Sequence, residues 1–241
     1  MSLHLSTWQD HEWPSRAHAL ITDPPFSKRT HTGMTPTRAD GIDPLEADYL
    51  GIDEADAQEL ADRFAPMLSE WAIVFCDHVA YHWHARAWAD HGWYVFGPVP
   101  FVKSNGSPRF AGDGPASAAE WIMIARPSKR VRDPGSRPGF YHGPVTGRDK
   151  LSRGAGHKPA WLLQALLRDY SKQGDLILDP FAGTATLGEV ATRGRRRYEG
   201  TEIDPKAFDL GLARLDHADR SPDLPGLLIG SQLLIDSEGS R

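Results

Sequence analysis

The feature that most limits how this chain can fold is an apolar run that ends abruptly in a Pro/Gly turn. Residues Leu176–Leu178 are apolar, and Asp179-Pro-Phe-Ala-Gly183 follows them directly. After the turn, residues Leu187–Arg193 have a composition compatible with a helix. This order predicts a buried strand, a ligand-binding loop and a crossover helix, the repeating unit of an α/β sheet.

The turn has the properties of a ligand loop, because loops at the carboxyl ends of parallel strands are where open α/β sheets bind ligands. Gly183 lets the backbone approach a ligand closely, and the following helix offers free N–H groups. About 20 residues later, a predicted strand from Tyr198 ends at Glu202, the usual position of a partner for ribose hydroxyls. The three glycines of the dinucleotide fingerprint are missing, so a nucleoside-type cofactor is favoured over NAD.

A second proline-containing turn lies near the other end of the chain, where the apolar strand Leu20-Ile-Thr22 runs into Asp23-Pro24-Pro25-Phe26. With both turns, residues 3–217 resemble the amino methyltransferases of nucleic acids, which use S-adenosylmethionine (SAM). In that family an Asp/Asn/Ser-Pro-Pro-Tyr/Phe loop holds the target amino group, and an Asp-Pro-Phe-x-Gly loop holds SAM. The target loop comes first here, an order similar to that of the β class of DNA amino methyltransferases.

The resemblance implies an α/β fold with a Rossmann-like, seven-stranded, mostly parallel sheet and a circularly permuted motif order. We expect residues 1–126 to form the target-base half of the catalytic domain, with an acidic helical insertion at about 40–70. A short basic segment, 127–156, would resemble a recognition region. Residues 157–218 would form the SAM-binding half, and residues 219–241 a C-terminal extension.

The Asp-Pro-Pro-Phe turn suits methylation of an exocyclic amino group, which is a poor nucleophile because its lone pair is delocalised into the ring. The Asp23 carboxylate and the Pro24 carbonyl can accept hydrogen bonds from its two N–H groups and aim the lone pair at the methyl. Pro25 lacks an N–H and stiffens the turn. Phe26 offers a face for stacking an extruded base, a contact worth ~1–3 kcal/mol. The alternative is a plain Pro-Pro turn after a strand.

For the cofactor, the resemblance implies that Asp179 accepts from the methionine ammonium and that Phe181 packs near the sulfonium and adenine. Glu202 would bind the ribose hydroxyls, with a solvated strand end as the alternative. Lys158 would contact the methionine carboxylate, with a surface lysine at a proline-started helix as the alternative. The predicted cofactor-binding residues are Asp179, Pro180, Phe181, Gly183, Thr184, Glu202 and Lys158.

The net charge of −5 does not indicate nucleic acid, but the charges are segregated along the chain. Residues 126–158 hold nine Lys/Arg against two Asp, and residues 40–70 hold ten acids against one Arg. This fits a basic face toward phosphate, although two ordinary solvated surfaces would look the same. The candidate nucleic-acid contacts are Lys28, Arg29, Lys103, Arg109, Arg130, Arg132 and Arg137.

These features predict methyl transfer from SAM to a flipped base of double-stranded DNA. The resemblance favours adenine N6, because Asp in the target loop is commoner with adenine and Ser with cytosine. Three alternatives stay open: an N4-cytosine enzyme, an RNA amino methyltransferase, and a catalytically inert protein that binds SAM and nucleic acid. The basic segment is short for a recognition domain, so two explanations stay open: the target sequence is short or relaxed, or a second protomer contributes, as in a homodimer.

The cysteine, histidine and hydropathy patterns bear on disulfide bonds, secretion, membrane insertion and metal binding. The single Cys76 excludes an intrachain disulfide and fits a reducing compartment. His4 and Gln9 interrupt any signal-peptide pattern, and no apolar run approaches the ~20 residues of a membrane helix. We therefore expect a cytoplasmic protein without membrane contact. No metal is expected either, since a ligand pair that would complete a zinc site is missing beside the group Cys76, His78, His82, His84 and His91.

Overall fold

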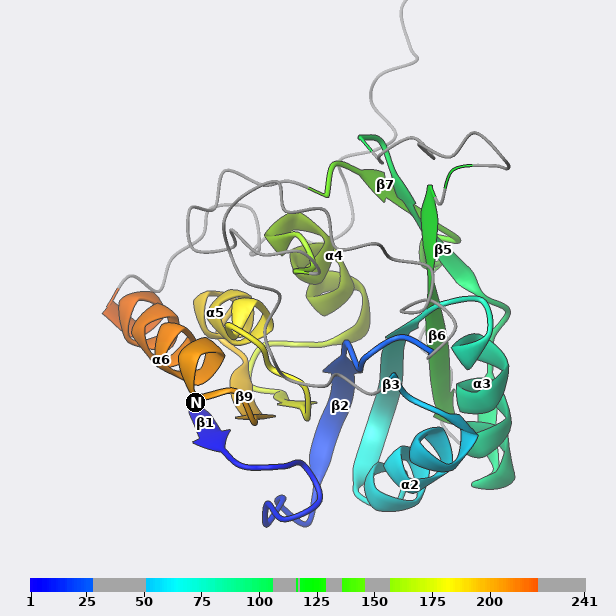
Figure 1. Ribbon diagram of the computed structural model, residues 1–241, viewed down its shortest axis with the longest axis horizontal. Coiled ribbons are helices and arrows are strands. Elements are labelled where there is room, and N and C mark those ends of the chain that lie inside the picture. The colour runs from blue at the N-terminus through cyan, green and yellow to red at the C-terminus, as the bar shows by residue number, and fades with distance from the viewer. Residues whose placement is uncertain (28–50, 106–115, 117, 129–135, 146–156, 221–241) are drawn as a thin grey trace, which may run out of the picture.

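The computed structural model describes residues 1–27, 51–105, 116, 118–128, 136–145 and 157–220 (Figure 1). Within these residues one sheet runs through the molecule in the order β1-β9-β8-β2-β3-β6-β5-β7, with β4 also paired to β6. The strands are β1 (Ser2–Leu5), β2 (Ala17–Thr22), β3 (Leu68–Cys76), β4 (Trp93–Val95), β5 (Val99–Lys103), β6 (Ala119–Pro127), β7 (Tyr141–Gly143), β8 (Leu176–Asp179) and β9 (Arg197–Glu202). The helices are α2 (Glu54–Phe64), α3 (Ala80–Asp90), α4 (Ala160–Tyr170), α5 (Thr186–Arg193) and α6 (Pro205–Arg220).

The sheet is mostly parallel, as expected. Strands β1, β9, β8, β2 and β3 pair in parallel, and β6 is antiparallel to its neighbours β3, β4 and β5. The described residues give nine strands, where seven were expected. Strands β4 and β5 pair with successive parts of β6, so an interruption around Gly97-Pro98 divides the chain beside β6 into two strands. Strand β7 lies in the basic segment, which shows no apolar periodicity, and pairs with β5.

Two layers of helices cover the sheet, with α4, α5 and α6 on one face and α2 and α3 on the other (Figure 1). Because successive side chains of a strand point to opposite faces, the central strands feed both cores. In β3, for example, Ile73 packs in the core under α4 and α5, while Val74 packs in the core under α2 and α3. Their continuous apolar sequences follow from this two-sided burial.

The described part of the expected acidic insertion is α2, which connects the parallel strands β2 and β3 as an ordinary crossover helix. Its acidic start has a local cause. The Asp53 carboxylate accepts from the backbone N–H groups of Ala55 and Asp56, and the Asp56 side chain accepts from the Asp53 N–H. This reciprocal capping satisfies N–H groups that the first helical turn leaves free.

Across the described ranges, none of the helices has the length and apolar character needed to cross a membrane.

Candidate active site

Four parallel strands deliver acidic residues to one edge of the sheet. Strands β9, β8, β2 and β3 are neighbours, and their carboxyl ends carry or directly precede Glu202, Asp179, Asp23 and Asp77. These residues are far apart in the sequence, yet the parallel topology brings them together, as it does at ligand sites of other open α/β sheets. The hydroxyl of Thr22, the last residue of β2, donates to Asp179 Oδ1 at 2.9 Å and so links the two loops.

The Asp23 carboxylate belongs to a row of alternating charges. Lys158 Nζ lies 2.6 Å from Asp23 Oδ2 and 3.3 Å from Glu120 Oε2, and Lys103 Nζ lies 2.5 Å from Glu120 Oε1. The Lys158 side chain is only 8% exposed, and its ammonium also lies 5.1 Å from the centre of the Phe26 ring. A buried ammonium between two carboxylates fixes the position of both.

Burial and charge act against each other in this row. Burial raises the pKa of Asp23, and the adjacent Lys158 ammonium offsets part of that effect. Burial disfavours the charge of Lys158 itself, but Asp23 and Glu120 raise its pKa above the ordinary value. Burial likewise works against ionisation of Glu120, but Lys158 and Lys103 hold its pKa below the ordinary value. We infer that Lys158 stays protonated and that it stabilises the ionised form of Asp23.

One carboxylate oxygen of Asp23 has no hydrogen-bond donor among the described residues. Asp23 Oδ1 is shielded from solvent, and no described residue donates a hydrogen bond to it. A buried carboxylate oxygen without a donor costs free energy, so such an atom calls for an explanation. It lies on the polar-Pro-Pro-aromatic turn, where the sequence predicts an acceptor for an amino group. Pro24 of this turn is buried, and Pro25 and Phe26 are half-buried.

The end of this turn is fastened by Asp77, a residue that sequence reasoning missed. Asp77 Oδ2 accepts from the backbone N–H of Ser27 at 3.0 Å and from its hydroxyl at 2.5 Å. Asp77 Oδ1 accepts from the N–H groups of Val79 and Ala80 at 2.9 and 2.8 Å, at the start of α3. One buried carboxylate therefore caps a helix and holds the target turn. The available signal was its place directly after a buried strand, at the same edge as Asp23.

Asp179 is buried at the end of β8. Its Oδ1 accepts from the Thr22 hydroxyl and from the Phe181 N–H at 3.3 Å, and its Oδ2 accepts from the Tyr198 hydroxyl at 3.3 Å. Burial raises the pKa of Asp179 to about 7, although these hydrogen bonds favour the ionised form. A cation placed beside Asp179 would favour ionisation further, because opposite charge favours the charged form.

Glu202 organises the loop after β8. Its Oε2 accepts from the Gly183 N–H at 2.7 Å, and its Oε1 accepts from the N–H groups of Ile203 and Asp204 at 2.9 and 2.8 Å. Burial raises the pKa of Glu202, and these backbone donors oppose that shift. Gly183 has a left-handed φ of 53°, and a Cβ atom there would meet nothing within 4 Å, so the space beside this backbone is open.

The other residues of the predicted cofactor loop are near by. The Pro180 carbonyl accepts from the Thr201 hydroxyl at 2.8 Å, and the Thr184 hydroxyl lies 3.5 Å from a ring nitrogen of His157. Phe181 is half-buried, with its ring centre 6.2 Å from that of Trp8. Lys158 lies instead on the target side, against Asp23 and Glu120. Its contact to a cofactor carboxylate stays a prediction.

Two of the candidate nucleic-acid contacts are described, and both have partners within the protein. Lys103 pairs with Glu120. Arg137 Nε donates to the backbone carbonyl of Asp169 at 2.8 Å, and its guanidinium lies 4.6 Å from the centre of the Trp71 ring. Such contacts fix Arg137 against the body of the protein. The other candidates, Lys28, Arg29, Arg109, Arg130 and Arg132, lie outside the described residues.

The raised pKa of Asp179 predicts a pH-dependent stability. Between the ordinary pKa of 3.8 and about 7, the folded protein keeps a proton that the unfolded chain has lost. The free energy of unfolding should therefore fall as the pH rises through this range. From pH 5 to pH 8, the free energy of unfolding should fall by on the order of 2–3 kcal/mol less in Asp179→Asn than in the wild type. Urea unfolding at both pH values measures this difference, and Asp90→Asn, at an exposed site, is the control. Equal declines in wild type and Asp179→Asn would contradict the assignment.

Comparison with known families identifies the protein class. A family model for the N6/N4 type, described as "DNA methylase", matches residues 17–213. The chain belongs to this family. The match includes both proline-containing turns and the strands that carry them, which confirms the family recognised from the sequence.

Relatives of known description share parts of the chain. Type II methyltransferase M.Cfr9I of Citrobacter freundii is 27% identical over 146 residues, which cover 56% of this chain and 49% of that protein. DNA adenine methyltransferase YhdJ of Escherichia coli (strain K12) is 44% identical over 61 residues, 25% of this chain and 21% of that protein. The chain spans about half the length of the type II methyltransferases that it matches.

Solved structures share the fold. The M1.HpyAVI–SAM complex superposes with a TM-score of 0.62 at 20% identity, over 83% of this chain and 89% of that chain. PvuII DNA methyltransferase, described as cytosine-N4-specific, gives a TM-score of 0.62 at 13% identity, over 88% of this chain and 85% of that chain. These likenesses confirm the predicted α/β methyltransferase fold.

Proposed function

We propose that this protein transfers a methyl group from SAM to the exocyclic amino group of a base in DNA, with adenine N6 as the favoured target. The observation that carries the proposal is the shielded, donor-free Oδ1 of Asp23 on the Asp-Pro-Pro-Phe turn. An amino group can supply the missing donor. The same edge of the sheet holds the loop of Asp179, Gly183 and Glu202, so amino group and methyl donor would meet there.

The residues of the second loop fit SAM. The cofactor carries a methionine ammonium, ribose hydroxyls and a sulfonium, and when bound it supplies an electrophilic methyl group. Asp179 is a buried carboxylate suited to the ammonium, and Glu202 is a buried carboxylate at the strand end where ribose partners lie. The open space beside Gly183 admits a ligand close to the backbone. The SAM complex of M1.HpyAVI, which has the same fold, supports this assignment.

The target turn has a definite role in the reaction. The ionised Asp23 carboxylate accepts from one N–H of the amino group and the Pro24 carbonyl from the other, which directs the nitrogen lone pair toward the methyl. As the nitrogen–carbon bond forms and the carbon–sulfur bond breaks, the nitrogen becomes more acidic, and Asp23 is placed to take the departing proton. Lys158 remains charged and favours the ionised form of Asp23 against the effect of burial. Much of the rate would come from this alignment.

Adenine is favoured over cytosine because the target turn begins with Asp, which in this family is commoner with adenine. The name of the adenine methyltransferase YhdJ agrees with this preference. The likeness to PvuII methyltransferase supports cytosine N4 as the second candidate. For either base to reach a turn at the sheet edge it must leave the duplex, so we propose that the target nucleotide is flipped out and stacks on Phe26.

Transfer of labelled methyl from SAM to duplex DNA tests the proposal, with the methylated nucleosides identified by mass spectrometry. N6-methyladenine is the expected product. N4-methylcytosine would move the assignment to cytosine while preserving the enzyme class. Transfer to RNA but not to DNA would overturn the substrate. SAM binding without transfer to either nucleic acid would favour the inert binding protein.

A further inference from the structure

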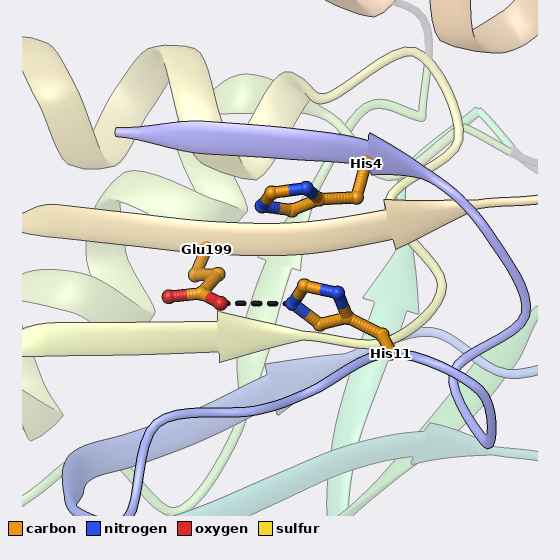
Figure 2. Close-up of side chains that lie close together, drawn as sticks. All are labelled: His4, His11 and Glu199. Atoms are coloured by element: carbon orange, nitrogen blue, oxygen red, sulfur yellow. Dashed lines mark hydrogen bonds and ion pairs between the residues drawn. The ribbon is translucent and has the colours of Figure 1, made fainter.

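A second cluster of chemically active side chains lies on the sheet near the first strand, away from Asp23. Figure 2 shows that His4 projects from β1, Glu199 from β9, and His11 from the segment that joins β1 to β2. His11 Nε2 lies 2.8 Å from Glu199 Oε1, and the ring centres of His4 and His11 are 4.3 Å apart. One donor atom from each residue lies within 4.8 Å of the other two.

The fold brings these three residues together by its topology. Strands β1 and β9 pair in parallel, with Ser2 opposite Glu199 and His4 opposite Thr201, so His4 and Glu199 point to the same face of the sheet. The segment after β1 then turns back over that face and places His11 beside them (Figure 2). Arg63 donates to the His11 carbonyl at 2.9 Å, and the Trp13 ring packs edge-on at 4.7 Å from the His11 ring.

The donor chemistry of the cluster suits a cation. Each imidazole carries a ring nitrogen whose lone pair can bind a metal ion, and one donor atom of each of the three residues lies within 4.8 Å of the other two. Glu199 provides the negative charge, and its side chain is 19% exposed. Two imidazoles and one carboxylate, all half-buried, form a set of nitrogen and oxygen donors typical of zinc sites that keep a fourth position for water.

We propose that His4, His11 and Glu199 bind a divalent transition-metal ion of the Zn²⁺ type. Zinc bonds to nitrogen and oxygen are about 2.0–2.2 Å long, so tetrahedral donors lie roughly 3.3–3.6 Å apart. Donor atoms up to 4.8 Å apart would have to approach by up to about 1.5 Å, which side-chain rotation of His4 can supply, and the His11–Glu199 pair would have to separate slightly. These residues differ from the histidine-rich group around α3 that the sequence analysis set aside.

The ion would cross-link the segment between β1 and β2 to strands β1 and β9. That segment carries Trp8, which is buried and has its ring centre 6.2 Å from that of Phe181 in the proposed cofactor loop. Joining His11 to β1 and β9 through a metal would therefore hold Trp8 in place. The role is structural, and the binding site itself does not depend on the proposed methyl transfer.

Binding of Co²⁺ and Zn²⁺ to the full chain tests the site without any activity assay. Calorimetry with Zn²⁺ and the visible absorbance of Co²⁺ should show one saturable site in the wild type. His4→Ala, His11→Ala and Glu199→Gln should each weaken binding by at least about tenfold, since loss of even an outer partner of a metal ligand costs 10–100-fold. Lowering the pH to 5 should weaken binding as well, because protons compete for the imidazoles.

His91 supplies a matched control. His91 Nε2 lies 2.7 Å from Asp62 Oδ1, and the described residues add no third ligand to this histidine–carboxylate pair, so His91→Ala should bind the metal like the wild type. Glu199→Gln keeps a hydrogen-bond partner for His11, so this variant decides the matter if the histidine variants fail to fold. A wild type without saturable binding, or unchanged affinity in Glu199→Gln, would overturn the proposal and leave an ordinary ion pair beside a stacked imidazole.

Discussion

Asp23→Ala should lose methyl transfer by at least about 10²-fold while SAM affinity stays within roughly twofold of the wild type. The variant removes the oxygen that accepts from the amino group and the base that takes its proton. The cofactor residues Asp179 and Glu202 lie on other strands and keep their hydrogen-bond partners. The measurements are the rate of labelled-methyl transfer to DNA under saturating SAM and calorimetry of SAM binding.

Two further variants make this result specific. Asp90→Ala removes an exposed carboxylate at the end of α3 and should leave transfer unchanged. Lys158 loses its nearest partner when Asp23 is shortened, so thermal unfolding must show that Asp23→Ala still folds. Asp23→Asn keeps the shape of the side chain and should also transfer slowly, because the amide is neither a base nor a charged acceptor. Near-normal turnover in both Asp23 variants would rule out the proposed role.

Glu202→Ala should weaken SAM binding by about ten- to a hundredfold. Hydrogen bonds to a charged group contribute about 1.5–3 kcal/mol each, and 1.4 kcal/mol corresponds to tenfold in affinity. The variant removes the proposed ribose partner and also frees the N–H groups of Gly183, Ile203 and Asp204, so the loop loses its present shape. Calorimetry of SAM binding gives the affinity directly.

Glu202→Gln separates these two effects. The amide can still accept from some of the backbone donors, so the loop should be retained better than in Glu202→Ala, while the charge is lost. Intermediate affinity in this variant is expected. Glu59→Ala, at an exposed position of α2, is the control for losing a carboxylate. SAM affinity equal to that of the wild type in both Glu202 variants would place the cofactor elsewhere.

The site residues that lie at the ends of strands could be predicted from the sequence. An apolar run that stops at a polar residue marks the end of a buried strand, and parallel strands end at one edge. Asp23, Asp179 and Glu202 could therefore be expected near one another before any coordinates were known. The links between them, such as Thr22 to Asp179, need the order of the strands, which periodicity does not contain.

The contacts around Lys158 could not be predicted in the same way. They require the antiparallel placement of β6, which brings Glu120 to this edge, and the approach of the start of α4 to the target turn. The sequence associates Lys158 with the cofactor, because its segment resembles the one that precedes the SAM strand in the family, and that contact stays a prediction. Strand β7 was missed because three residues in a basic, proline-rich segment carry no periodic signal.

The pairing of β1 with β9 has a consequence for how the molecule assembles. Ser2 and Glu199 are register partners although almost the whole described chain separates them in sequence. Closing so large a loop carries an entropic cost that local contacts do not, and pairings of this kind slow folding. During synthesis β1 leaves the ribosome long before β9 has been made, so β1 stays unpaired until β9 is available. We expect the target side of the sheet to form first and β1 to dock last, when α6 and β9 are already in place.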